Sequence, residues 1–194
     1  LDPNYALAWA AQAHIHEDIV GHTDADQAEH YQRSMEAIEK ALAIDPNLSE
    51  AYSALCNYKN TYEYNVVGAE TACKRAVELD PKSPVAHKTY AKFLYSRGRF
   101  DEAIVEIKAA IDIQPVSYRN QQIYALTLYY ARRYEEAEAQ FKRLIELNPN
   151  QTNFVEGRLV KVLEQQGKDS EAFEYLVRSV TSQKADKETL ERYK

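Results

Sequence analysis

Prolines recur along this chain at a nearly constant interval, and this period constrains the fold more than any other feature. Five of the six prolines follow an acidic or amide residue, in the pairs Asp2-Pro3, Asp45-Pro46, Asp80-Pro81, Gln114-Pro115 and Asn148-Pro149. In this series successive prolines are 43, 35, 34 and 34 residues apart. A fixed period of roughly 20 to 50 residues is the mark of repeat proteins, in which each repeat is one supersecondary unit. The sequence therefore predicts a repeat protein whose first repeat carries extra residues.

An apolar stripe precedes each of the last four prolines of this series. The residues twelve, eight and five positions before Pro81 are Ala69, Cys73 and Ala76, and spacings of four and three put them on one face of a helix. The proline ends this helix, because it has no N–H and disfavours helical angles in the residue before it. The same offsets select Ser34, Ile38, Ala41, Ala103, Ile107, Ala110, Ala137, Phe141 and Leu144.

Another apolar stripe follows each proline. Positions six, nine and ten after Pro81 are His87, Tyr90 and Ala91, which also share one helical face. A short turn, Arg97-Gly98-Arg99-Phe100, then leads to the next stripe. Each repeat is thus predicted to be an antiparallel pair of helices. The chain has only 5 glycines and 6 prolines beside abundant helix-forming residues, so we expect an all-α protein.

We expect a single array over residues 1–194, with repeats at about 4–46, 47–81, 82–115, 116–149 and 150–182. The fifth repeat is shifted by one residue, so that residues 153–166 form its first helix and Ala172, Leu176 and Ser179 its second stripe. Residues 183–194 are predicted to be a C-terminal capping helix or the start of a truncated repeat. Both ends are interpreted as cut from a longer protein.

These offsets resemble those of the tetratricopeptide repeat (TPR) family, and segments 98–104 (GRFDEAI) and 133–137 (RYEEA) match it closely. The resemblance implies a right-handed superhelix, an α-solenoid of helix-turn-helix repeats whose first helices line a concave binding face. More weakly, segments 62–70 and 129–137 resemble the C-terminal TPR regions of bacterial winged-helix regulators, adenylate cyclases and serine/threonine kinases. Such regions sense or recruit, and another domain carries the output activity.

Residues that bind a partner are expected on the concave face of the middle repeats. Positions about seven, eleven and fourteen after each proline form the stripe turned away from the core. In the middle repeats this stripe contributes Asn57, Asn60, Lys88, Lys92, Tyr95, Gln122 and Tyr129, and the same offsets also reach Ala10 and Ser53. Amides can hydrogen-bond a peptide backbone, tyrosines offer contact area, and the two lysines favour a partner with an acidic segment. The alternative is an ordinary solvated helix face.

Catalysis and metal binding find little support in the sequence. It shows no nucleophile beside a base and no glycine-rich phosphate loop, so we predict no enzyme and no cofactor. Residues 18–30 are interpreted as a polar loop insertion. The histidines in and near it have spacings that do not converge on a metal, and no metal site is predicted among His14, His16, His22 and His30.

Cys56 and Cys73 lack the CxxC spacing of zinc and redox sites. Free buried thiols are the favoured interpretation, because an unpaired cysteine behaves as a small hydrophobe. A disulfide between the two is the alternative.

Charge and hydropathy exclude further classes of function. The net charge of -6 argues against nucleic-acid binding, which needs a surplus of Lys and Arg on one face. No apolar run approaches the roughly 20 residues that cross a bilayer, so no membrane contact is expected. The predicted compartment is the cytoplasm, or the periplasm if a transmembrane helix lies upstream. The predicted function is a non-catalytic protein-protein interaction module of a larger bacterial signalling or transcription-regulatory protein; the alternative is a self-association unit that builds a homo-oligomer.

Overall fold

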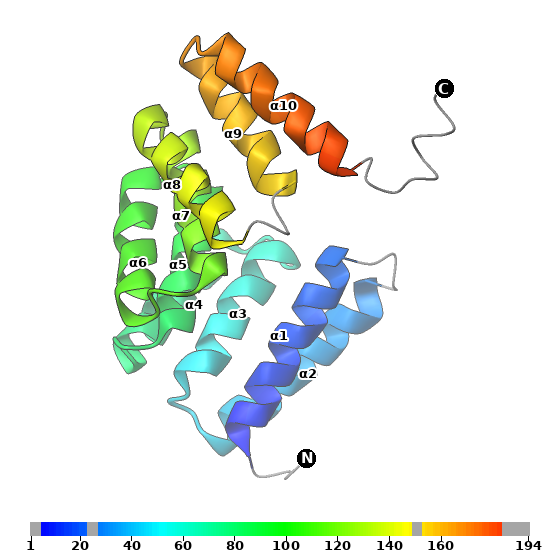
Figure 1. Ribbon diagram of the computed structural model, residues 1–194. Coiled ribbons are helices and arrows are strands. Elements are labelled where there is room, and N and C mark those ends of the chain that lie inside the picture. The colour runs from blue at the N-terminus through cyan, green and yellow to red at the C-terminus, as the bar shows by residue number, and fades with distance from the viewer. Residues whose placement is uncertain (1–4, 23–26, 149–152, 184–194) are drawn as a thin grey trace, which may run out of the picture. The chain divides into compact units, whose positions relative to one another are not determined.

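The computed structural model of the chain describes residues 5–22, 27–148 and 153–183. In these ranges every regular element is an α-helix (Figure 1). In chain order the helices are α1 (Ala6–His22), α2 (Gln27–Ile44), α3 (Ser49–Thr61), α4 (Val66–Leu79), α5 (Pro84–Ser96), α6 (Phe100–Ile113), α7 (Tyr118–Tyr130), α8 (Tyr134–Leu147), α9 (Asn153–Gln165) and α10 (Asp169–Gln183). Each predicted repeat range contains one pair of them, except that α10 ends at Gln183, one residue past the fifth range. The predicted all-α fold is confirmed. Of residues 183–194, where a capping helix or truncated repeat was predicted, residues 184–194 lie outside the described residues.

The residues around each proline explain where the helices end and begin. The carboxylate of Asp80 accepts a hydrogen bond from the backbone N–H of Lys82 (2.9 Å), which closes the turn after α4. Ser83 then caps α5, since its hydroxyl accepts from the N–H of Ala86, and Pro84 occupies the first turn, where a missing N–H costs nothing. Ser117 caps α7 in the same way.

The predicted apolar stripe forms the core of the first four repeats. All twelve residues of that stripe are 1% exposed or less. The small residue of the stripe lets the two helices of a pair approach closely. In the first repeat that residue is Ser34, whose hydroxyl donates to the carbonyl of Ala13 on the facing helix (3.3 Å).

The chain divides into two compact units, residues 1–115 and 116–194, and the border falls between the third and fourth predicted repeats. In unit 1 the pairs are α1/α2, α3/α4 and α5/α6, and α3 packs against both α1 and α5. In unit 2 the pairs are α7/α8 and α9/α10, and α8 packs against α9. That all five repeats form one array stays a prediction.

The first connection is not the long polar loop that was predicted over residues 18–30. Helix α1 continues to His22 and α2 begins at Gln27, so most of the extra residues extend these two helices. The side chain of Trp9 on α1 packs against apolar residues of α2 and lies 4.4 Å from the ammonium of Lys40 (ring centroid to Nζ).

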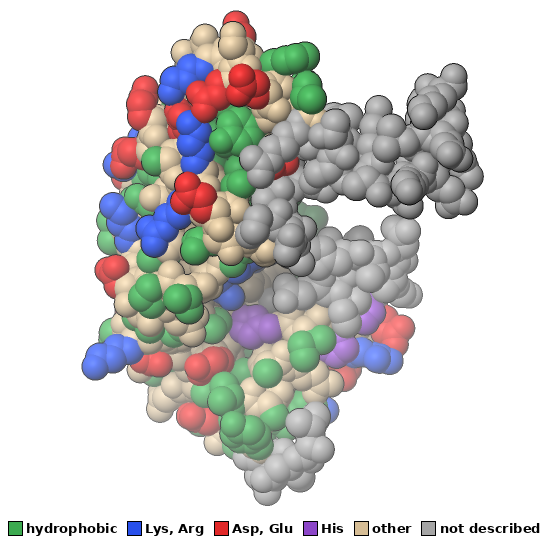
Figure 2. Space-filling model, viewed as in Figure 1, with side chains coloured by type: hydrophobic (Ala, Val, Ile, Leu, Met, Phe, Trp, Pro, Cys, Tyr) green, Lys and Arg blue, Asp and Glu red, His purple; other side chains and the backbone are tan. Residues whose placement is uncertain are grey.

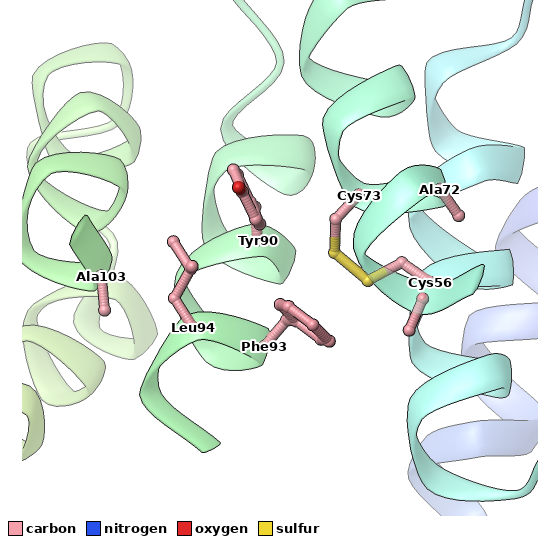
Figure 3. Close-up of a cluster of buried hydrophobic side chains, with 8 residues drawn as sticks. Cys56, Ala72, Cys73, Tyr90, Phe93, Leu94 and Ala103 are labelled. Carbon is pink, nitrogen blue, oxygen red and sulfur yellow. A yellow bond between two sulfur atoms is a disulfide. The ribbon is translucent and has the colours of Figure 1, made fainter. Parts of the chain in front are cut away.

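The expectation of free thiols is wrong, because Cys56 and Cys73 form a disulfide that joins α3 to α4. Their Cα atoms are 5.1 Å apart, and both residues are fully buried. Figure 3 shows this bond facing Tyr90 and Phe93 of α5. The two positions belong to the core-facing stripes of one helix pair, and such stripes face each other across the pair. The disulfide is part of an apolar cluster made by Cys56, Ala69, Ala72, Cys73, Tyr90, Phe93, Leu94 and Ala103.

Ion pairs join neighbouring repeats within each unit. In unit 1, Glu70 on α4 accepts from Arg99, the residue before α6, at 2.8 Å. In unit 2, Glu138 on α8 accepts from Lys168 (2.6 Å) and Gln166 (2.9 Å) in the turn between α9 and α10. We call the interface between the second and third repeats in unit 1 the 2/3 seam, and that between the fourth and fifth repeats in unit 2 the 4/5 seam.

The fifth repeat departs from the predicted core pattern. Ala172 is buried as expected, but Leu176 is 46% exposed, and the side chain of Ser179 lies outside the description. Phe141 holds the equivalent position in α8 and is fully buried, because α9 packs on α8. No described helix follows α10 to cover Leu176 in the same way.

Candidate partner-binding surface

Five of the predicted binding residues lie on two packed helices of unit 1. Asn57 and Asn60 are on α3, and Lys88, Lys92 and Tyr95 are on α5, which packs against α3. Lys92 is exposed and the other four are partly exposed. The structure thus brings amides, cations and an aromatic ring onto adjacent helices. We call these five residues the α3/α5 surface.

In the first two repeats the offset rule reaches too far toward the core at its first position. Ala10 and Ser53, seven residues after their prolines, are fully buried and belong to the packing between helices. Their small side chains suit a close approach of neighbouring helices. On α3 the surface therefore begins one turn later, at Asn57, whereas Lys88 and Gln122 at the same offset are partly exposed.

A cation that the sequence did not single out extends the α3/α5 surface. Arg97, just after the end of α5, donates from Nη2 to the side-chain oxygen of Asn60 on α3 (2.5 Å). Its guanidinium carbon also lies 5.7 Å from the ring centroid of Phe93, a cation–π arrangement that helps to hold the side chain in place. A cation in this position is also favoured by the partial negative charge at the carboxyl end of the helix.

Tyr95 has a structural role beside its predicted binding role. Its ring lies edge-on to Phe100, with centroids 6.1 Å apart, and it packs against the apolar cluster around the disulfide. Part of the ring therefore belongs to the core, and only the remainder is available to a partner.

The two predicted residues of unit 2, Gln122 and Tyr129, are both partly exposed on α7. They are seven residues apart, so they lie on one face of that helix. The ring of Tyr129 contacts Tyr130 and Tyr134, with centroid separations of 5.0 and 6.1 Å. In the same unit, acidic and basic side chains lie beside one another on the face shown in Figure 2.

Two of the histidines that seemed too far apart are neighbours. The Nδ1 atoms of His16 on α1 and His30 on α2 are 3.0 Å apart. Burial of His16, together with the nearby His30, lowers the pKa of His16. The described part of the chain holds no group of three or more His, Cys, Asp or Glu side chains arranged to bind a metal ion.

A buried histidine in unit 1, His87, is hydrogen-bonded through both of its ring nitrogens. Its Nδ1 lies 2.7 Å from a carboxylate oxygen of Glu106 and its Nε2 lies 3.0 Å from the carbonyl of Pro81, both of which accept hydrogen bonds. The hydrogen bond to Glu106 raises the pKa of this residue, His87, although burial opposes the shift. The imidazole links α5 to α6 and to the turn before α5, so its role is structural.

None of the helices in the described ranges has the length and apolar character needed to span a bilayer. This finding agrees with the absence of a long apolar run in the sequence.

Comparisons with known proteins identify the fold. The family model described as subunit 3 of the anaphase-promoting complex, or cyclosome, matches residues 62–144. A search of curated protein sequences gives no match.

Solved structures align over most of the chain. PilF of Pseudomonas aeruginosa aligns with a TM-score of 0.72 and 21% identity, over 91% of this chain and 77% of that one. MamA aligns with a TM-score of 0.70 and 18% identity, over 86% and 99%. YrrB, described as a TPR protein with an unusual peptide-binding site, aligns with a TM-score of 0.68 and 14% identity, over 99% and 93%. These likenesses confirm the predicted TPR fold.

Proposed function

We propose that this TPR-fold chain is a non-catalytic protein-protein interaction module, which binds a partner protein or an extended peptide on the face made by its first helices. The α3/α5 surface carries the proposal. Together with Arg97, it places amide groups beside three cations and a tyrosine ring, within unit 1. YrrB, whose fold is similar, is described as having a peptide-binding site, which supports the same use here. In the superhelix predicted for a TPR array this face is concave.

The charges of the α3/α5 surface favour a partner with an acidic segment. Lys88, Lys92 and Arg97 lie within ten residues of one another, although the whole chain has a net charge of -6. Cations gathered on one face of an acidic protein raise the rate of encounter with an acidic partner and disfavour basic ones. Gln122 and Tyr129 are the partner-contacting residues that we propose for unit 2.

Selection of displayed random decapeptides on the immobilised chain tests this function. We expect the selected peptides to be rich in Asp and Glu. Their affinity should fall about tenfold or more in the variant Lys88→Glu with Lys92→Glu, since like charges would then face the peptide. The variant Lys82→Glu with Arg143→Glu carries the same change in net charge outside the surface, so it is the matched control. Equal losses in the two variants would sink the proposal.

The alternative function is self-association, and the mass in solution separates it from partner binding. Analytical ultracentrifugation at micromolar concentration should give the mass of a monomer. A dimer that also forms in the Lys88→Glu, Lys92→Glu variant would favour a self-association unit instead.

We further propose that the module belongs to a larger bacterial signalling or transcription-regulatory protein. The resemblance of segments 62–70 and 129–137 to TPR regions of such proteins supports this context. The sequence points to the cytoplasm, but the Cys56–Cys73 bond favours the periplasmic alternative, because disulfides persist mainly in oxidising compartments. Reading the gene on both sides of this segment tests the context: an upstream winged-helix, cyclase or kinase domain is the expected result.

A further inference from the structure

The Cys56–Cys73 disulfide lies directly behind the α3/α5 surface. Cys56 immediately precedes Asn57 on α3, and its partner Cys73 is on α4. Tyr90 and Phe93 of α5 pack on the same cluster (Figure 3), and these residues alternate along α5 with Lys88 and Lys92. One covalent bond therefore fixes α3, which carries part of the surface, to α4, and α5, which carries the rest, packs on that bond.

Breaking this bond has a geometric consequence. The bond holds the two Cα atoms 5.1 Å apart. Two thiol sulfurs that are not bonded need about 3.5 to 4.0 Å between them, the ordinary separation of non-bonded heavy atoms. Both cysteines are fully buried in close-packed surroundings. Reduction must therefore turn a cysteine side chain against its packed neighbours or move α3 and α4 apart.

We propose that the Cys56–Cys73 pair is a redox lock on the partner-binding surface, an inference that rests on the function proposed above. In the oxidised chain α3 is held against α4, and the surface keeps the arrangement that binds the partner. In the reduced chain α3 is held less tightly against α4, and the affinity for the partner falls. The lock closes by thiol-disulfide exchange with a small disulfide compound: the two cysteine thiols give up two protons and two electrons, and the compound leaves as two thiols.

The burial of both sulfur atoms determines how the redox lock responds to a reductant in solution. A thiolate in solution has no access to sulfur atoms that are fully buried, so the folded oxidised chain resists reduction and the pair opens only when unit 1 opens. The lock therefore records the redox conditions in which the chain folded. It does not follow rapid fluctuations.

A direct test compares the affinity of one acidic decapeptide, selected on the oxidised chain, for three samples. These are the oxidised chain, the chain refolded in reductant, and the variant Cys56→Ala with Cys73→Ala. We expect reduction to weaken binding about fivefold or more, within the usual range of coupling between two sites. The alanine variant should bind weakly with or without reductant. Equal affinity of the oxidised and reduced chains would overturn the lock while leaving peptide binding intact.

Amide hydrogen exchange tests the lock without any ligand, so it still decides the matter if no peptide is selected. We expect the amides of α3 and α4 to exchange about tenfold faster or more after reduction. Those of α9 and α10, in unit 2, should be unchanged and are the internal control. Unchanged exchange in α3 and α4 overturns the lock. So does a loss of the helical circular dichroism on reduction, or a failure of oxidised glutathione to protect both thiols from alkylation under denaturing conditions.

Discussion

The 2/3 seam of unit 1 and the 4/5 seam of unit 2 start from the same position of the repeat, yet they are held differently. Glu70 and Glu138 each stand eleven residues before the proline that ends their helix. Glu70 meets Arg99 across the seam, and on the core side of the same helix lies the apolar cluster with the disulfide and Phe93. Glu138 meets both Lys168 and Gln166, and Lys142 beside it reaches Glu171 on α10 at 2.6 Å. Glu70 also meets Lys74 (2.9 Å), so both seams contain a charge network. Glu138 has more partners than Glu70, and the apolar cluster at the first seam contains the disulfide.

This difference teaches that a repeat can keep its helix pair while its neighbour contacts change character. The position twelve residues after the proline shows the same contrast. In the third repeat, at the 2/3 seam, it is Phe93, whereas in the shifted fifth repeat, at the 4/5 seam, it is Val162; both are buried. The two seams should therefore respond to different perturbations.

The largest effect is expected from truncating the apolar part of each seam. Phe93→Ala should destabilise unit 1 by about 3 to 5 kcal/mol, because it removes a buried ring and leaves a cavity. Val162→Ala should cost unit 2 about 2 kcal/mol, since it removes only two methyl groups. Urea unfolding followed by amide hydrogen exchange of each unit measures both. Equal losses would mean that the two seams do not differ in their apolar packing.

The next largest effect is expected from the carboxylates of the seams, and here unit 2 should lose more stability than unit 1. Glu138→Gln should destabilise unit 2 by about 2 kcal/mol, because a carboxylate hydrogen-bonded by cations contributes about 1.5 to 3 kcal/mol. Glu70→Gln should cost unit 1 less, about 1 kcal/mol, because its side chain is more exposed and exposed pairs are worth less. The same exchange experiment reports both losses. A larger loss at Glu70 would contradict the contrast between the seams.

Lowering the pH should reveal the contribution of Glu138 to the stability of unit 2. Burial raises the pKa of Glu138, but hydrogen bonds from Lys142, Lys168 and Gln166 outweigh it and lower the pKa to about 2 from the ordinary 4.5. A lowered carboxyl pKa stabilises the fold above 4.5, and this contribution is lost as the pH falls toward 2. Unit 2 should therefore weaken over that window, and Glu138→Gln should abolish this part of the pH dependence. A profile that the substitution leaves unchanged would refute the assignment.

A smaller effect of opposite pH dependence is expected in unit 1. The pKa of His87 is raised, chiefly by its hydrogen bond to Glu106. The stabilisation is fully present below the ordinary value of 6.5 and is lost as the pH rises through the raised pKa. We expect a loss of about 1 kcal/mol on that rise, measured by thermal unfolding between pH 6 and 9. Unit 2 has Gln121 at this position, so His87→Gln is the matched variant and should remove the dependence.

The smallest effects concern the turns within helix pairs. Among the described residues, each unit has one such turn in which the backbone of a non-glycine residue is left-handed, Tyr64 at φ 53° or Arg132 at φ 60°. Each also has another in which Gly98 or Gly167 is left-handed. Tyr64→Gly and Arg132→Gly should each stabilise their unit by about 0.5 kcal/mol, the relief of left-handed strain less the added freedom of the unfolded chain. Differential scanning calorimetry detects the gain. A loss would show that the tyrosine or arginine side chain stabilises its turn.

The periodic part of the fold could be predicted from the sequence because it depends on local spacing. Offsets counted from each proline select core residues that are indeed buried, and the turn at Gly98 lies where it was expected. The longer α1 and α2 could not be predicted in this way, since a period gives no signal for how far a helix extends beyond its repeat.

The candidate surface was predictable in outline only. Spacing located partly exposed residues on α3 and α5, but it gave no sign that Arg97 reaches back to Asn60. The disulfide could not be predicted because offsets show that Cys56 and Cys73 both face the core, yet not that they lie opposite each other along the helix axes. Contacts between side chains of different helices depend on axial register, which a count of residues along one chain does not contain.

Trp9 has a consequence for how the loss of structure can be observed. It is the only tryptophan in the chain, and it packs in the first repeat with Lys40 close to its ring. Stacked repeats are stabilised mainly by their nearest neighbours, so they can come apart in steps. Tryptophan fluorescence therefore reports on one repeat, whereas circular dichroism averages over all helices. A denaturant titration read by both signals would show directly whether the first repeat unfolds before the others.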